Sequence, residues 1–181
     1  MKTYTLISTK EREKILRYIL YKTGPLSVTA VAGHLNISKS LISNLFSKLC
    51  REKVLVRRES KYVLRETTRL KALRLLFNLS SFDPAFFSAY SFVRAAGIYG
   101  SWAKGTNTEE SDLDLWVKVQ NTDPMKLAKL QSSILKRHKD AKVLFLDNEK
   151  LKELKSKNIM FYHSLVFGSI IIYGGLDEIY E

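Results

Sequence analysis

The feature that most constrains this chain is a Gly-Ser pair followed, after ten residues, by two aspartates that flank a single leucine. Gly100 and Ser101 follow a mostly apolar run over residues 93–99, and Asp112 and Asp114 begin an alternating run. Residues two apart on a strand point to the same face, so we expect both carboxylates to project together while the neighbouring leucines enter a core. The pattern therefore predicts two strands joined by a loop, with paired carboxylates beside a glycine turn.

Two neighbouring carboxylates repel each other unless a cation lies between them. Hard divalent ions such as Mg²⁺ bind oxygen ligands, commonly one or two carboxylates together with substrate phosphates. The glycine turn complements them, because glycine allows close approach of the backbone and successive turn amides form an anion-binding nest. Lys104 lies in the same loop and is a candidate phosphate contact, although a solvated lysine explains it equally well. A metal beside a phosphate cradle predicts phosphoryl or nucleotidyl transfer.

The spacing of Gly-Ser, ten residues and Asp-x-Asp resembles the signature of the nucleotidyltransferase superfamily that includes DNA polymerase beta, and above all its minimal prokaryotic members. The resemblance covers about residues 84–175 and implies a small mixed sheet flanked by helices. It implies that Asp112 and Asp114 hold Mg²⁺. Gly100 and Ser101 would bind the triphosphate of an NTP such as ATP, whose nucleoside monophosphate passes to an acceptor hydroxyl. The acceptor would be a side chain of a toxin-like protein partner, a small molecule or a nucleic acid.

The same resemblance implies a third carboxylate on the strand after the intervening helix, where it acts as general base or completes the metal site. In this chain the position falls near Lys142 or Leu144, and neither residue is acidic. Three acidic residues flank that strand: Asp140, Asp147 and Glu149. A bend or a shift of register would be needed to bring one of them into reach. Without it, the site would bind a nucleotide but transfer it poorly.

The charge of the chain is unevenly distributed. Lysine and arginine number 30 against 18 acidic residues, and the whole excess of +12 lies within residues 1–81, whereas residues 82–181 are balanced. Such asymmetry indicates an anionic partner, such as nucleic acid, for the N-terminal part, and it favours two domains.

Helical periodicity divides the N-terminal part into three helices. A first amphipathic helix ends at a Gly-Pro pair, a short helix begins after Ser27, and a longer one begins after Ser38. Residues 54–65 then read as two short strands around a turn. This order, a short helix, a tight turn, a longer helix and a hairpin, resembles a winged helix-turn-helix domain over about residues 8–66. The resemblance implies binding of double-stranded DNA.

The resemblance places the DNA contacts on the longer helix and on the hairpin. The polar face of the helix would enter a major groove, and it consists of Ser38, Lys39, Ser40, Ser43, Asn44, Ser47 and Lys48. Basic residues of the hairpin would contact phosphates, and they are Arg57, Arg58, Lys61 and Arg65. The alternative is a module that binds protein through a solvated basic face. Helix-turn-helix regulators often act as homodimers, so a homodimer is a further expectation.

A fourth helical stripe follows over residues 68–79 and ends before a Ser-Ser pair. Its apolar residues fall on one face, which places Arg69, Lys71 and Arg74 outward. We interpret it as a connector between domains or as a dimerisation helix.

These patterns together predict an α+β protein with two domains. Residues 1–66 form a mostly helical winged helix-turn-helix with a β-hairpin wing, residues 67–83 a connecting helix and linker, and residues 84–181 a small mixed-sheet α/β nucleotidyltransferase fold. The expected function is Mg²⁺-dependent nucleotidyl transfer, with a DNA-binding domain that gives transcriptional regulation. The alternative is a DNA-binding regulator whose nucleotidyltransferase-like domain only binds a nucleotide or a partner protein.

The sequence also bears on the compartment. It contains no run of 18 apolar residues, so we expect no membrane span, and its first residues include no long apolar stretch typical of a signal peptide. A single cysteine, Cys50, excludes an internal disulfide and suits the cytoplasm. Cys50 lies in an amphipathic pattern, which favours a core position over a role as nucleophile.

Overall fold

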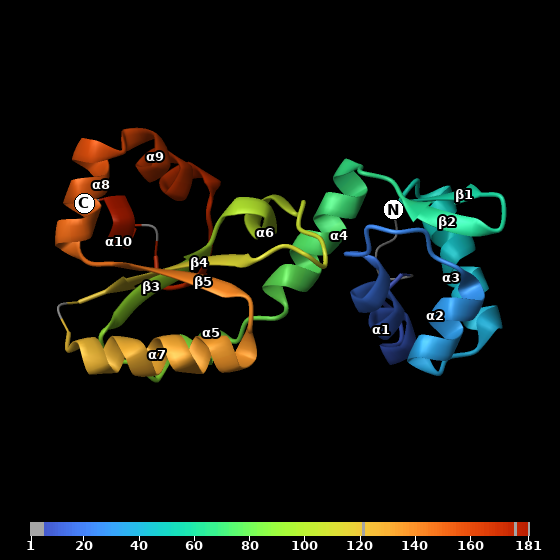
Figure 1. The fold of residues 1–181 in the computed structure, drawn as a ribbon, viewed down its shortest axis with the longest axis horizontal. Coiled ribbons are helices and arrows are strands. Elements are labelled where there is room, and N and C mark those ends of the chain that lie inside the picture. Colours follow the sequence, from blue (N-terminus) through green and yellow to red (C-terminus); the bar gives the residue numbers. More distant parts are fainter. Residues whose placement is uncertain (1–5, 121, 176, 181) are drawn as a thin grey trace. The chain divides into compact units, whose positions relative to one another are not determined.

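The computed structural model describes residues 6–120, 122–175 and 177–180. The chain divides into two compact units, drawn as a ribbon in Figure 1. The first unit contains the chain up to Phe77 together with Asn107–Glu109, and the second contains the remainder. The functional domain limits expected at residues 66 and 83 stay a prediction, because compactness alone does not define a functional domain.

Three helices and a hairpin begin the first unit. In chain order they are α1 (Lys10–Ile19), α2 (Val28–Leu35), α3 (Lys39–Arg51), β1 (Leu55–Arg58) and β2 (Lys61–Leu64). Side-chain caps explain where the helices begin, because the hydroxyls of Thr9, Ser27 and Ser38 each accept a hydrogen bond from a first-turn amide. Asn36 ends α2 in the left-handed conformation, with a φ of 53°, and so makes the tight turn into α3.

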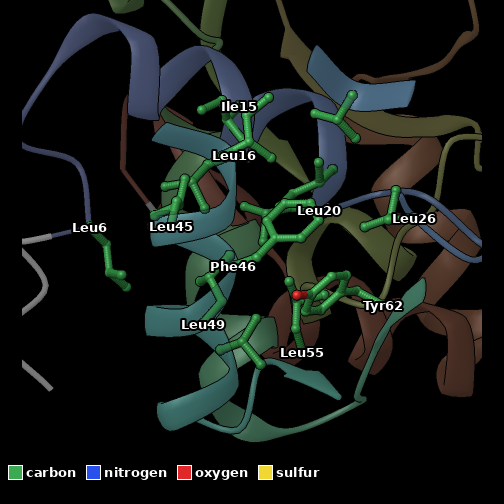
Figure 2. Packing of buried hydrophobic residues seen from close by; sticks show 14 of the residues in the cluster. Leu6, Ile15, Leu16, Leu20, Leu26, Leu45, Phe46, Leu49, Leu55 and Tyr62 are labelled. Carbon is green, nitrogen blue, oxygen red and sulfur yellow. The ribbon is translucent and has the colours of Figure 1, made fainter. Parts of the chain in front are cut away.

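The core of the first unit joins the helices to the hairpin, as Figure 2 shows. Leu16 of α1 and Phe46 of α3 are fully buried, and the Phe46 ring meets the ring of Tyr62 edge to face, with 4.8 Å between centroids. Tyr62 of β2 also exchanges two backbone hydrogen bonds with Leu26, at 2.7 and 2.8 Å, which ties the chain before α2 to the hairpin. Cys50 is half-buried against this core.

The helix α4 (Thr68–Leu79) buries a residue that the sequence pattern placed outward. Arg74 does not point outward but is almost completely buried. Its Nε donates to the carbonyl oxygen of Leu20 at 2.7 Å, and its Nη1 donates to Oε1 of Glu66 at 2.9 Å. Helical periodicity assigned this cation to the polar face, whereas its hydrogen bonds satisfy it inside the first unit.

The second unit is built around one mixed sheet. Its elements in chain order are α5 (Pro84–Ser88), β3 (Val93–Ile98), α6 (Gly100–Lys104), β4 (Leu113–Val119), α7 (Pro124–Arg137), β5 (Ala141–Leu146), α8 (Asn148–Lys157), α9 (Ile159–Gly168), β6 (Ile170–Tyr173) and α10 (Asp177–Tyr180). The strand order is β5-β4-β3-β6; β4 and β5 run parallel, and the other two pairs are antiparallel. The predicted α+β class is confirmed.

Helices cover both faces of this sheet, α5 and α7 on one and α8, α9 and α10 on the other (Figure 1). The alternation along β4 explains the two layers, because Leu115 packs with Leu130 of α7 on one face while Trp116 packs with Tyr162 of α9 on the other. In the part of the chain that the structure describes, no helix combines the length and apolar character needed to cross a membrane.

Candidate active site

The sheet brings the two halves of the sequence motif together at one end. Because β3 and β4 are antiparallel, the residues after Ile98 meet those before Leu113, and the amide of Tyr99 donates to the carbonyl oxygen of Asp114 at 3.0 Å. The strand β5 runs parallel to β4, with Ala141 paired to Leu113, so its first residues reach the same end. The site therefore forms where β3 ends and where β4 and β5 begin.

Glycine is favoured at position 100 for two reasons. Gly100 has a φ of 65°, in the left-handed region that side chains disfavour. A Cβ atom at this position would also overlap Oδ2 of Asp114. The sequence suggested that glycine allows a ligand to approach the backbone closely. In the structure, the group that lies close to Gly100 is the carboxylate of Asp114.

Residues 100–104 form the short helix α6 where the pattern predicted an open loop. Tyr99 is its N-cap and makes no side-chain capping hydrogen bond, so its side chain does not satisfy the first-turn amides of Gly100 and Ser101. Gly105 ends the helix with a φ of 63°, and Lys104 is exposed in the last turn. Five residues are too few to display a helical period, which is why the sequence missed this helix.

A lysine accompanies the two aspartates. Asp112 is exposed just before β4, and Asp114 is half-buried as the second residue of that strand. Lys142 of β5 is paired in register with Asp114, and its Nζ lies 2.6 Å from Oδ2 of Asp112. Burial raises the pKa of Asp114, Lys142 opposes that rise, and Asp112 adds to it. The hydrogen bond and charge of Asp112 raise the pKa of Lys142.

The topology decides which flanking acid lies near this end. Asp140 immediately precedes β5, and its carbonyl oxygen accepts a hydrogen bond from the amide of Leu113 at 3.1 Å. Asp147 and Glu149 follow the opposite end of β5, where Asp147 caps α8 by accepting from the amide of Lys150 at 2.7 Å. The parallel register thus places Asp147 and Glu149 away from the aspartate pair, and only Asp140 of the three lies at the right end.

The oxygen ligands at this end suit one hard divalent ion. Among the described residues, no group of three or more histidine, cysteine or acidic side chains is arranged to hold a metal. Mg²⁺ commonly binds through one or two carboxylates and takes further ligands from substrate phosphates. Asp112 and Asp114 therefore fit Mg²⁺ as two carboxylate ligands, with phosphate oxygens and water completing its coordination.

The helix α9 borders the site and carries an exposed apolar stripe. The ring of Phe161 meets the ring of Tyr99 edge to face, with 6.1 Å between centroids. Burial of the Tyr99 side chain raises the pKa of its hydroxyl. On the outer face of α9, Met160 is 78% exposed and Phe167 is 76% exposed. His163 stacks on Phe167 with 5.7 Å between centroids. Sequence periodicity did not reveal this stripe, because apolar residues occupy both the buried and the exposed sides of α9.

His138 closes α7 and belongs to an aromatic cluster. It is the C-cap residue and follows the basic last turn of that helix. Its ring stacks on Phe82 with 5.0 Å between centroids and meets Trp102 edge-on at 6.5 Å. Burial lowers the pKa of His138, with a smaller contribution from the charge of Arg137. The environment is that of a packed aromatic ring.

The residues predicted to contact DNA lie on α3 and the hairpin of the first unit. On α3, those exposed are Ser38, Lys39, Ser40, Asn44 and Ser47, whereas Ser43 and Lys48 are half-buried. The Ser38 hydroxyl is already used as the cap of α3, since it accepts from the amide of Leu41 at 3.4 Å. Basic residues of the hairpin are exposed, and they are Arg57, Arg58 and Lys61. DNA binding itself stays a prediction.

Comparison with known families agrees with this geometry. A family model described as polymerase beta nucleotidyltransferase matches residues 84–175, about half of the chain. The chain belongs to the polymerase beta nucleotidyltransferase family. Membership makes it an enzyme of the nucleotidyl-transferring class, and the matched residues include the whole Gly-Ser and Asp-x-Asp motif.

Solved structures similar to this nucleotidyltransferase are distant. A mutant of the toxin–antitoxin MntA-HpeT is 15% identical, with a TM-score of 0.38, and the match covers 52% of this chain and 73% of that chain. A toxin–antitoxin with AMP-PNP is 18% identical, with a TM-score of 0.34 and coverage of 62% and 78%. A tri-AMPylated HEPN toxin from Shewanella oneidensis with its MNT antitoxin is 14% identical, with a TM-score of 0.33 and coverage of 60% and 76%. None of the curated proteins compared with the chain matches it.

Proposed function

We propose that this protein transfers a nucleoside monophosphate from an NTP to an acceptor hydroxyl at the site formed by Gly100, Ser101, Asp112 and Asp114. One observation carries the proposal: inside the family-matched domain, Gly100 lies against the carboxylate of Asp114 at the meeting point of β3 and β4. This contact supports a single site that combines the glycine turn, proposed to bind phosphate, with the aspartates, proposed to bind metal. Family membership gives the reaction class, and the residue roles are proposed from this geometry.

The chain's own groups would act as follows. Asp112 and Asp114 provide oxygen ligands for Mg²⁺, which supplies charge stabilisation for the phosphates when it is bound. The first-turn amides of Gly100 and Ser101 hold the triphosphate, because amides at a helix start favour anions. Lys104, exposed in the last turn of α6, adds a positive charge. The acceptor hydroxyl loses its proton to solvent as its oxygen bonds to the α-phosphorus, the bond from that phosphorus to the oxygen bridging to the β-phosphate breaks, and pyrophosphate leaves with that oxygen.

A protein is the acceptor that we favour. The site borders α9 through the contact between Tyr99 and Phe161, and the same helix exposes Met160 and Phe167. Large apolar side chains that remain solvent-exposed are typical of surfaces that bind another protein. A partner docked on α9 would bring a Ser, Thr or Tyr hydroxyl to the aspartate pair.

For the first unit we propose a winged helix-turn-helix that binds double-stranded DNA in the cytoplasm and gives transcriptional regulation, with a homodimer as the binding species. The tight turn at Asn36, the exposed polar face of α3 and the basic hairpin support it. A second candidate function is a regulator whose nucleotidyltransferase domain only binds nucleotide. The lysine at position 142, near where the resemblance implies a third carboxylate, favours this candidate.

Transfer is tested with NTPs labelled either at the α-phosphate or at the γ-phosphate, incubated with the protein, Mg²⁺ and an extract that contains candidate acceptors. Nucleotidyl transfer should leave covalent label on the acceptor from the α-labelled NTP only, and Asp114→Asn should abolish it. Label from the γ-phosphate would contradict the proposed chemistry. Binding of nucleotide with no covalent label from either position would favour the nucleotide-binding regulator.

A further inference from the structure

Lys142 lies where it controls access to the aspartate pair. Its Nζ lies 2.6 Å from Oδ2 of Asp112, and across the parallel ladder its Cα partner is Asp114. The side chain therefore starts from the strand next to the carboxylates and ends on one of them. No sequence motif marks this residue, because its place depends on the register between β4 and β5.

The ammonium of Lys142 opposes the binding of a free divalent ion. With Lys142 beside them, Asp112 and Asp114 present a net charge of about −1 rather than −2. A divalent ion that uses Asp112 must displace the ammonium or lie next to it. A dication and an ammonium about 4 Å apart repel each other appreciably even in water. The pair therefore binds a free metal ion more weakly than two aspartates alone would.

The same contact is easily opened. The Lys142 side chain is 70% exposed and that of Asp112 is 47% exposed, and exposed ion pairs add little net stability. A lysine ammonium on its flexible stem rotates readily from one acceptor to another. The triphosphate of an NTP brings several negative charges, so it supplies both an acceptor for the ammonium and extra ligands for the metal.

We propose that Lys142 makes metal binding conditional on nucleotide. Without nucleotide, its ammonium holds Asp112 and disfavours free divalent ions. When an NTP binds, the ammonium moves to a phosphate oxygen and leaves Asp112 to the metal, so metal and NTP enter together. The inference rests on the proposed function of the site, and it adds a residue that determines the order of binding.

The test compares the wild type with Lys142→Met in two titrations. The first uses Mn²⁺ alone, followed by electron paramagnetic resonance, and the second uses the Mn²⁺ complex of α,β-methylene ATP, GTP, CTP or UTP, followed by calorimetry. Loss of the ammonium should tighten Mn²⁺ binding on the order of tenfold and should weaken binding of the Mn²⁺–nucleotide complex several-fold. Opposite changes in the two titrations would show that the Lys142 ammonium moves from Asp112 to the nucleotide, because a merely structural ion pair would not produce them.

Two control variants separate charge from other effects. Lys142→Arg keeps the positive charge and should keep the weak binding of Mn²⁺ alone. Lys126→Met removes an exposed charge from α7, near the far end of β4, and should change neither titration. Unchanged Mn²⁺ affinity in Lys142→Met would overturn this inference alone. A wild type that binds neither Mn²⁺ nor any Mn²⁺–nucleotide complex would overturn the proposed function as well.

Discussion

Gly100 lies directly against Asp114, so closely that a Cβ atom at position 100 would overlap the Oδ2 atom of that carboxylate. The two residues are far apart in the sequence motif, and the antiparallel pairing of β3 with β4 brings them together. The contact explains why the motif joins a glycine to an aspartate. The backbone of Gly100, proposed to bind phosphate, therefore lies beside the Asp114 carboxylate, proposed to bind metal.

Replacing this glycine should damage stability and binding together. Gly100→Ala is expected to lower the free energy of unfolding by about 1–2 kcal/mol, because alanine is strained in the left-handed conformation, whereas rotation of the Asp114 carboxylate relieves the overlap with the new Cβ atom. Displacement of the carboxylate should also abolish Mg²⁺-dependent nucleotide binding. Urea denaturation and calorimetry measure the two effects. Gly168→Ala is the matched control, since its Cβ would meet nothing within 4 Å; an equal loss in both variants would contradict the account.

The strand that carries the aspartates is anchored by a buried tryptophan. Trp116 is fully buried, and its Nε1 donates to the Ser169 Oγ at 2.9 Å. Ser169→Ala should lower the free energy of unfolding by about 1–3 kcal/mol, because it leaves the indole N–H without its partner. Ser164→Ala, on the exposed side of α9, should change it by less than about 0.5 kcal/mol. Equal effects of the two substitutions in urea denaturation would disprove this role of Ser169.

Stability should also depend on pH through His138. Burial lowers its pKa in the folded state below the ordinary value of 6.5, so the unfolded chain binds the proton more readily. The contribution of His138 is therefore complete above the unfolded pKa and is lost as the pH falls through the folded pKa. His138→Phe keeps a ring to stack on Phe82 but cannot be protonated, and it should lose less stability between about pH 7.5 and pH 5.5. Urea denaturation at the two pH values measures the stability lost by the wild type and by His138→Phe. Identical losses would exclude His138 as the titrating group.

The hairpin should contribute phosphate contacts if the first unit binds DNA. Arg58 and Lys61 are paired across the hairpin and both are exposed. The double variant Arg58→Ala/Lys61→Ala should bind random duplex DNA more weakly, and its salt dependence, log K against log salt, should be shallower by about 2. Fluorescence anisotropy at several salt concentrations measures both. Lys126→Ala/Lys152→Ala removes the same charge from the second unit, and an equal change in slope there would argue against a hairpin contact.

Local sequence patterns predicted long strands and helices, whereas contacts between residues distant in the chain did not follow from them. Alternation in β4 and helical periodicity in α4 predicted both elements, because each pattern is repeated over enough residues to show its period. The short helix α6 was missed for lack of length, and the burial of Arg74 was missed because its partners Leu20 and Glu66 lie elsewhere in the chain. The pairing of Lys142 with Asp112 required the register of a parallel strand pair, which no local pattern contains.

The most direct test of the central claim is calorimetric titration of ATP, GTP, CTP and UTP with Mg²⁺, into the native protein and into Asp112→Asn/Asp114→Asn. We predict saturable binding of at least one nucleotide that requires Mg²⁺ and is lost in the double variant, because the carboxylates would then no longer bind the metal. Absence of binding by every nucleotide, or equal binding by the double variant, would contradict the claim that these two aspartates form a nucleotidyltransferase site.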